Sequence, residues 1–378
     1  MPVTLTPPLT QAFPEPLWTF QTADAIWGTP SVGNRTVYIG SDDGNLYAVA
    51  AQTGNLMWKF ASQGIIRSQP AIDGGLVYIA SDDGCLYAVN AQDGTQAWRT
   101  DIGNALARDV RESLGTNTSP TGWDYKQSSP IVAEGRVYVG SLNGKVYALA
   151  RDTGQVTWTY QTGGKVRSTP LFDNGTLYVG SWDKYSYALD AQTGQLRWKT
   201  FVGGEVQSTA LVANNLVYTA SRKASVIALD SKTGEAQWEY SYGTNMWVES
   251  SPVLANGTVY IGSSASKWIL GLESASGEYL TAFKSQAFHW STPAIADRML
   301  FIGGASYRAE RNAGGLYGFQ LVDGAFASAD HAQWYFPIEK TMEAQGSWSG
   351  VASSPVIEDG VIYIGALDGK LYGIRTVP

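Results

Sequence analysis

Cysteine and histidine are scarce in this chain of 378 residues, which contains one cysteine, Cys85, and two histidines, His289 and His331. A single cysteine excludes an internal disulfide. So few cysteines and histidines leave no zinc site of the common kind. The HExxH, P-loop and GxSxG motifs of many hydrolases and nucleotide-binding enzymes are also missing. The sequence predicts no metal site and no catalytic residues, and it favours a protein that is not an enzyme.

Basic runs and long apolar runs are absent as well. The 26 basic and 33 acidic side chains give a net charge of -7, without the basic face that nucleic acid requires. No apolar stretch approaches the roughly 20 residues of a membrane helix. Residues 1–16 form a Pro/Thr-rich tail without the basic start, apolar centre or lipidation cysteine of a secretion signal. We therefore expect no nucleic acid partner, no membrane span and no signal peptide.

A repeated block is the dominant feature of what is present. The copies are variants of one pattern, Tyr-(Ile/Val)-Gly-Ser, a short Asp/Asn-Gly turn, (Leu/Val)-Tyr-Ala-(Val/Leu) and Thr-Gly. Most copies are 40 to 42 residues apart, and two intervals are 60 and 62 residues long. A period of this size with several strands per unit is typical of propeller blades. The anchoring aromatic residues are Tyr38, Tyr78, Tyr138, Tyr178, Tyr218, Tyr260, Phe301 and Tyr363.

Four short strand patterns fill each copy. In the first copy they lie at about residues 28–32, 36–41, 45–49 and 55–60, separated by turns rich in Gly, Asp and Thr. The Asp42-Asp43-Gly44 turn supplies the positive φ of a tight hairpin. A small residue follows each second strand, and we expect a fourth-strand tryptophan such as Trp58 to pack against it.

The two ends of the chain complement one another. The last copy ends at Ile374 without a fourth strand. Residues 17–20, which precede the first copy, resemble a fourth strand. Joining them would close the ring and remove exposed sheet edges. The sequence predicts an all-β fold, an eight-bladed β-propeller of four-stranded antiparallel blades closed by the N-terminal strand. Its expected domains are a tail over residues 1–16 and one propeller over residues 17–378.

The copies resemble the pyrroloquinoline-quinone-type repeat family. The segments that carry the resemblance run from Ala48 to Trp58 and from Ala188 to Trp198, with similar stretches ending at Trp98, Trp158 and Trp238. In that family the segment is the tryptophan-docking motif, whose indole packs on the adjoining blade. Copy six departs from it at Thr281, and copy seven delays Trp334 by an insertion. The family includes quinoprotein alcohol dehydrogenases and a noncatalytic scaffold lipoprotein of outer-membrane assembly, which is closer to this chain in size.

The resemblance bears on cofactors and location. Quinoprotein enzymes hold their quinone with calcium beneath a disulfide of adjacent cysteines, which one cysteine cannot form. We expect no cofactor, and pyrroloquinoline quinone with calcium is the alternative. A glycine- and tryptophan-rich, lysine-poor composition favours an extracytoplasmic location, in the periplasm or cell envelope.

The copies differ most just before the innermost strand, where one position per blade forms a ring about the axis. Aromatic and basic residues there could hold a planar ligand, a peptide or a sugar. The ring positions are Trp27, Arg67, Gln127, Arg167, Gln207, Glu249, Trp290 and Ala352, and Lys126, Asn245, Trp247 and Trp348 lie close to them in sequence.

Three functions fit this ring. The first, which we favour, is a noncatalytic scaffold or sensor that binds a protein partner or small ligand at its axial face and inserted loops, as a monomer. The second is a quinone-binding oxidoreductase. The third is a glycan-binding domain.

Overall fold

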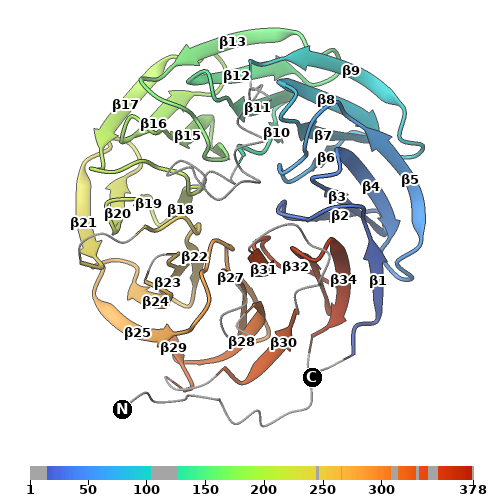
Figure 1. The fold of residues 1–378 in the computed structure, drawn as a ribbon. Coiled ribbons are helices and arrows are strands. Elements are labelled where there is room, and N and C mark those ends of the chain that lie inside the picture. The colour runs from blue at the N-terminus through green and yellow to red at the C-terminus, as the bar shows by residue number, and fades with distance from the viewer. Residues whose placement is uncertain are drawn as a thin grey trace.

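The computed structural model describes residues 15–103, 127–243, 247–264, 266–307, 314–328, 332–338 and 348–376. Within these ranges every regular element is a β-strand, and no helix is present that could cross a membrane. Eight antiparallel sheets stand side by side around a central axis (Figure 1). The predicted eight-bladed propeller is confirmed.

The blades follow one another along the chain, each running from an inner to an outer strand. Blade one comprises β2 (Ser31–Gly33), β3 (Thr36–Gly40), β4 (Asn45–Ala50) and β5 (Leu56–Ala61). Blade two comprises β6 (Ala71–Asp73), β7 (Leu76–Ala80), β8 (Cys85–Asn90) and β9 (Gln96–Asp101). Blade three comprises β10 (Ile131–Ala133), β11 (Arg136–Gly140), β12 (Lys145–Ala150) and β13 (Val156–Gln161). Blade four comprises β14 (Leu171–Asp173), β15 (Thr176–Gly180), β16 (Tyr185–Asp190) and β17 (Leu196–Phe201).

The remaining blades continue this order. Blade five comprises β18 (Leu211–Ala213), β19 (Leu216–Ser221), β20 (Ser225–Asp230) and β21 (Ala236–Ser241). Blade six comprises β22 (Val253–Ala255), β23 (Thr258–Gly262), β24 (Trp268–Glu273) and β25 (Tyr279–Lys284). Blade seven comprises β26 (Ala294–Ala296), β27 (Met299–Tyr307), β28 (Gly315–Val322), β29 (Ala325–Phe326), β30 (Trp334–Pro337) and β31 (Trp348–Gly350). Blade eight comprises β32 (Val356–Glu358), β33 (Val361–Gly365), β34 (Lys370–Arg375) and the N-terminal β1 (Trp18–Gln21).

The ring closes through strand β1, as predicted. It pairs antiparallel with β34 from Trp18 opposite Gly373 to Gln21 opposite Lys370. Next to this joint, β2 of blade one contacts β32 of blade eight. The first and last parts of the chain therefore form one sheet.

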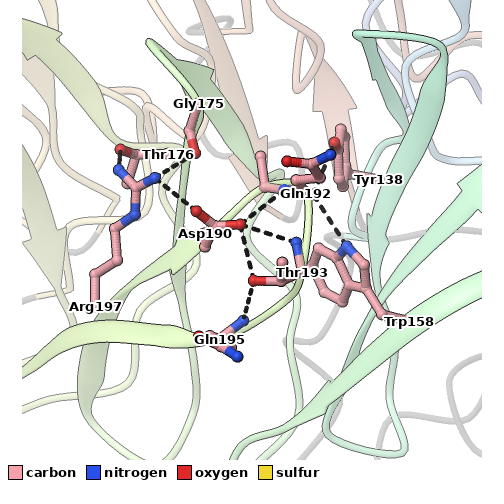
Figure 2. Close-up of polar contacts among 10 residues, drawn as sticks. Tyr138, Trp158, Gly175, Thr176, Asp190, Gln192, Thr193, Gln195 and Arg197 are labelled. Atoms are coloured by element: carbon pink, nitrogen blue, oxygen red, sulfur yellow. Dashed lines mark hydrogen bonds and ion pairs between the residues drawn. The ribbon is translucent and has the colours of Figure 1, made fainter.

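The docking tryptophans join each blade to the next, but they pack on a different glycine from the one expected from the sequence. Figure 2 shows the joint between blades three and four, where the Trp158 indole and the Tyr138 hydroxyl both donate to the carbonyl oxygen of Ala191 at 3.0 Å. The indole lies on Gly194, where an added Cβ would come within 2.6 Å of it. The expectation that these indoles pack on the small residue after a second strand is wrong. That space holds the aliphatic residue that opens the next blade, such as Ile66 over Gly40.

A charged turn supports this joint. The Asp190 carboxylate accepts hydrogen bonds from the backbone of Gln192 and Thr193 and pairs with Arg197 at 2.8 Å (Figure 2). The Arg197 hydrogen bond, followed by those of Thr193, lowers the pKa of Asp190 to about 2. The Thr-Gly turn is thereby held in the shape that receives the indole.

Blade six uses a different residue for the same purpose. Thr281 occupies the register position of the missing tryptophan, opposite Gly271. Phe326, in strand β29 of blade seven, packs on Tyr260 at 6.0 Å and donates its backbone N–H to the Thr281 hydroxyl. In blade seven, Trp334 takes the fourth-strand place opposite Gly318. Part of the long insertion in blade seven therefore replaces the missing tryptophan contact between blades six and seven.

The second aspartate of each pair, Asp43 or Asp83, stabilises its hairpin turn. Asp43 accepts from the backbone N–H of Asn45 and of Ala23 and from the Tyr47 hydroxyl. Gly44 follows with a φ of 85°. The turn interpretation of Asp42-Asp43-Gly44 is confirmed, and these oxygens are engaged within the protein.

Candidate binding pocket on the propeller axis

In the segment before each inner strand, side chains alternate between the core and the axis, and those that face the axis form the ring. In blade two, Ile66 is buried against Gly40, Arg67 turns toward the axis, Ser68 is buried again and Gln69 turns toward the axis. The Ser68 hydroxyl makes two hydrogen bonds with the backbone of Ala80, donating to its oxygen at 2.9 Å and accepting from its N–H at 3.0 Å. Because every second side chain is anchored in this way, the axial side chains are fixed in place.

Two layers of side chains enclose one pocket of about 120 Å³ on the axis. The ring positions predicted from the sequence supply one layer, and the residues two positions later supply the other. The pocket is lined by Trp27, Arg67, Gln127, Gln207, Glu249, Trp290 and Ala352, and by Thr29, Gln69, Ser129, Thr169, Thr209, Ser251, Thr292 and Ser354.

The second layer is a belt of hydroxyl groups that links neighbouring blades. Ser129 accepts the backbone N–H of Gln69 at 2.8 Å, and Thr169 accepts that of Ser129 at 3.1 Å. The belt also crosses the closure of the ring, where the Thr29 hydroxyl accepts the N–H of Ser354 at 3.1 Å. A hydroxyl that accepts one hydrogen bond keeps its own proton for donation.

Both charged residues of the pocket wall are paired inside the protein. Arg67 binds Asp42 with two hydrogen bonds, of 2.8 Å from Nε and 2.6 Å from Nη2. Burial raises the pKa of the Asp42 carboxyl, and the Arg67 charge opposes that shift. Glu249 accepts from Arg222 Nε at 2.8 Å.

Tryptophans form one side of the pocket. The rings of Trp27 and Trp290 lie 6.1 Å apart on the two blades that flank Ala352. Behind them, Trp348 packs edge-on against Trp290 at 4.7 Å, and Phe288 stacks on Trp290 at 6.0 Å.

Two of the other predicted residues, Arg167 and Trp247, are described by the structure and do not line the pocket. Arg167 is only 3 % exposed, and its guanidinium lies over the Trp182 ring at 5.1 Å rather than in the pocket wall. Trp247 is 36 % exposed, and the Arg222 guanidinium stacks between it and Trp182, at 4.7 and 4.9 Å. Lys126 and Asn245 lie outside the described residues.

The residues that hold the ring side chains in place were not predicted from the sequence. Asp42 binds Arg67, and Asp82 accepts from Gln127 Nε2 at 3.1 Å. Each follows the Ser of Tyr-(Ile/Val)-Gly-Ser or its equivalent, and this position also differs between copies. The same divergence between copies that marked the ring could therefore have revealed this position. In successive copies it is occupied by Asp42, Asp82, Leu142, Trp182, Arg222 and Ser264.

A sequence comparison decides the family. The profile of the family described as outer membrane protein assembly factor BamB matches residues 14–120 and 115–327. The chain belongs to this family of pyrroloquinoline-quinone-like repeat propellers. A search of curated proteins found no match.

Solved structures share the fold of this family member. BamB from Moraxella catarrhalis is 16 % identical, with a TM-score of 0.70 over 96 % of this chain and 99 % of that one. Quinohemoprotein alcohol dehydrogenase from Comamonas testosteroni is 14 % identical, with a TM-score of 0.71 over 96 % of this chain and 76 % of that one. The computationally designed Ika8 protein is 14 % identical, with a TM-score of 0.67 over 94 % and 97 %. At these identities the likeness concerns the fold.

Proposed function

We propose that this chain is a noncatalytic scaffold of the cell envelope, which binds a protein partner through the axial pocket and the surface around it. The observation that carries the proposal is the contrast between a constant frame and a variable ring. The frame repeats in every blade, while the pocket wall changes from Trp27 to Gln127 to Glu249. A wall without the symmetry of the blades suits a partner that has no such symmetry.

The family supports the same proposal. Its description is that of an outer membrane protein assembly factor, and the Moraxella structure is a BamB protein that spans nearly the same length. An assembly factor of this kind acts by contact with other proteins. A location in the periplasm or at the outer membrane follows from that role.

The pocket does not fit a quinone cofactor with calcium. About 120 Å³ is well below the roughly 300–1,000 Å³ of pockets for drug-sized ligands. Its carboxylate, Glu249, is bound by Arg222, and its guanidinium, Arg67, is bound by Asp42. In the described part of the chain, His, Cys, Asp and Glu side chains form no group of three or more that could hold a metal ion.

Photocrosslinking tests the proposed partner site. A photoreactive amino acid replaces Gln69, which is exposed and lines the pocket, and the cells of the source organism are irradiated. Gln237 on the outer strand β21 is also exposed and serves as the control. We expect a discrete protein adduct from position 69 and none from position 237. Adducts from position 237 alone, or from neither position, would refute an axial partner site.

A further inference from the structure

One face of the propeller carries the hairpins between the second and third strands, together with the segments that lead to the inner strands. In blades four, five and six the hairpin and the segment lie side by side, because a backbone N–H of the hairpin donates to a carbonyl oxygen of the segment. These bonds join Trp182 to Lys165 at 2.9 Å, Arg222 to Glu205 at 2.9 Å and Ser264 to Trp247 at 3.2 Å. The three blades are neighbours in the ring (Figure 1). We call this part of the face the basic sector, and it comprises residues 163–167, 181–185, 203–207, 221–225, 247–249, 263–264 and 266–268.

Exposed lysines give the sector a charge opposite to that of the whole chain. Basic residues outnumber acidic ones in it, although the net charge of the chain is -7. Lys165, Lys184 and Lys223 are exposed. Lys184 pairs with Glu205 at 3.8 Å and Lys223 with Glu239 at 3.2 Å, and such exposed pairs are weak, so these ammonium groups can bind other carboxylates. The corresponding hairpins of blades one and two carry acidic residues instead, Asp42, Asp43, Asp82 and Asp83.

Two lysines of the sector occupy a backbone position that favours glycine. The residue before the third strand is Gly44 in blade one and Gly84 in blade two, with φ of 85° and 96°. In blade four this residue is Lys184, with φ of 74°, and in blade six it is Lys267, with φ of 61°. A side chain at positive φ strains the backbone, and strain of this kind is characteristic of functional sites. The lysines are thus present at a position where glycine would suit the turn better.

Aromatic rings are exposed beside these charges. The Arg222 guanidinium stacks between the Trp182 and Trp247 rings, at 4.9 and 4.7 Å, and fixes the position of both. Trp247 is the outer ring of this stack and is 36 % exposed. Phe201, which leads from strand β17 into the sector, is 60 % exposed and meets Tyr185 edge-on at 5.4 Å. The sector therefore combines positive charge with exposed aromatic surface.

We propose that the basic sector binds an acidic segment of the protein partner, in which carboxylates alternate with aromatic or large apolar side chains. The carboxylates contact Lys165, Lys184 and Lys223, and the apolar side chains pack on Trp247 and Phe201. This proposal rests on the proposed function and names the chemistry by which the partner is recognised. A nucleic acid fits less well, because carboxylates lie between the lysines and along blades one and two of the same face and would repel its phosphates.

Short peptides test this chemistry without the partner. The capped pentapeptides Glu-Phe-Glu-Phe-Glu and Lys-Phe-Lys-Phe-Lys are titrated into the full chain, and binding is followed by ligand-observed NMR. The negative net charge of the protein by itself favours the basic peptide. We expect the opposite preference, with the acidic peptide binding in the millimolar range and about tenfold more tightly than the basic one. Raising the salt concentration to about 0.5 M should reduce this preference, because salt screens exposed charges.

Three variants locate the binding site. Lys184→Gly should weaken binding of the acidic peptide by about twofold to fivefold, the range expected for one exposed charge. Its melting temperature should be unchanged or higher, because glycine suits a φ of 74°. Lys223→Gln should weaken binding by a similar factor. Lys232→Gln is the matched control, because it removes one exposed charge from the β20–β21 turn at the opposite end of blade five and should leave binding unchanged.

Each other outcome overturns the proposal. Equal or tighter binding of the basic peptide, no binding of the acidic peptide, or unchanged binding by both Lys184→Gly and Lys223→Gln would each do so. Tighter binding of a single-stranded oligothymidylate than of the acidic peptide would assign the sector to nucleic acid instead.

Photocrosslinking from position 69 separates this failure from that of the proposed function. Adducts without a preference for the acidic peptide would mean that a partner is recognised by other chemistry. A preference for the acidic peptide that depends on Lys184 and Lys223, without adducts, would support the basic sector as a binding site and refute the axial partner site.

Discussion

At the scale of single residues, the main departure from the repeat is a histidine in the core. His289 is 0 % exposed and stands where other blades place Ile66, Val206 or Val351. Its Nδ1 lies 2.9 Å from the Gly303 carbonyl, which can only accept, so the proton is on Nδ1. Nε2 then accepts from the Ser285 hydroxyl at 2.6 Å. The buried imidazole is thus neutral and satisfied.

We predict that His289 makes the fold sensitive to mild acid. Burial lowers its pKa from 6.5 to about 4. Between these values the unfolded chain binds a proton that the folded chain does not, so stability is complete above pH 6.5 and falls as the pH approaches 4. The loss amounts to about 3 kcal/mol. Urea unfolding of the wild type and of His289→Val at pH 7 and 4.5 measures it. A pH dependence that is the same in both proteins would contradict this account.

At the scale of elements, a tryptophan indole joins neighbouring blades in the same way at most positions, and blade six is an exception. The Trp58, Trp98 and Trp198 indoles each donate to a carbonyl oxygen of the next blade, at 2.9 to 3.0 Å. Blade six has Thr281 instead, and Phe326 reaches back from blade seven to fill the space. An insertion in one blade thus compensates for a substitution in the one before it.

We predict that Phe326→Ala destabilises the protein by about 3–5 kcal/mol, the usual cost of removing a buried phenylalanine. The reason is that its ring packs on both Tyr260 and Phe319, at 6.0 and 5.3 Å. Val322→Ala in strand β28 is the control, because that side chain is exposed. Denaturant unfolding of both variants gives the comparison. Equal effects would mean that the ring of Phe326 does not hold blades six and seven together.

Much of the fold could be predicted because each blade repeats its own pattern. Tyr38, Gly44 and Trp58 recur at fixed spacing, so the strands, turns and closure were readable from the sequence. Contacts between blades were harder, because Phe326 lies in an insertion with no counterpart in other copies. The ring positions were readable as divergence between copies. The partners of Arg67 and Glu249 were not, since each comes from the preceding blade and becomes a neighbour only in the closed ring.

At the scale of the whole molecule, the ring is a single closed structure held by one terminal strand. The Trp18 indole donates to the carbonyl oxygen of Ala51 at 2.9 Å and stacks against Gly54. The same joint that links neighbouring blades elsewhere therefore links the two ends of the chain. The belt of hydroxyl groups also crosses this closure, from Ser354 to Thr29.

We predict that Trp18→Ala destabilises the whole propeller by about 3–5 kcal/mol, because its indole is buried at the closure. Leu17→Ala is the neighbouring control, since Leu17 is exposed. Hydrogen exchange should show faster exchange in β33 and β34 of blade eight and in β3 of blade one. Faster exchange limited to β1 would show that the ring does not depend on this strand.

The central claim is that a partner binds at the axis, and its affinity for ring variants is the most direct test. The protein recovered by crosslinking from position 69 is titrated by calorimetry against the wild type, Trp290→Ala and Leu196→Ala, the last on the exposed outer strand β17. A residue at the centre of an interface contributes about 2 kcal/mol or more. The account predicts at least about thirtyfold weaker binding for Trp290→Ala and unchanged binding for Leu196→Ala. Wild-type affinity in Trp290→Ala, with weakened binding in Leu196→Ala, would contradict it.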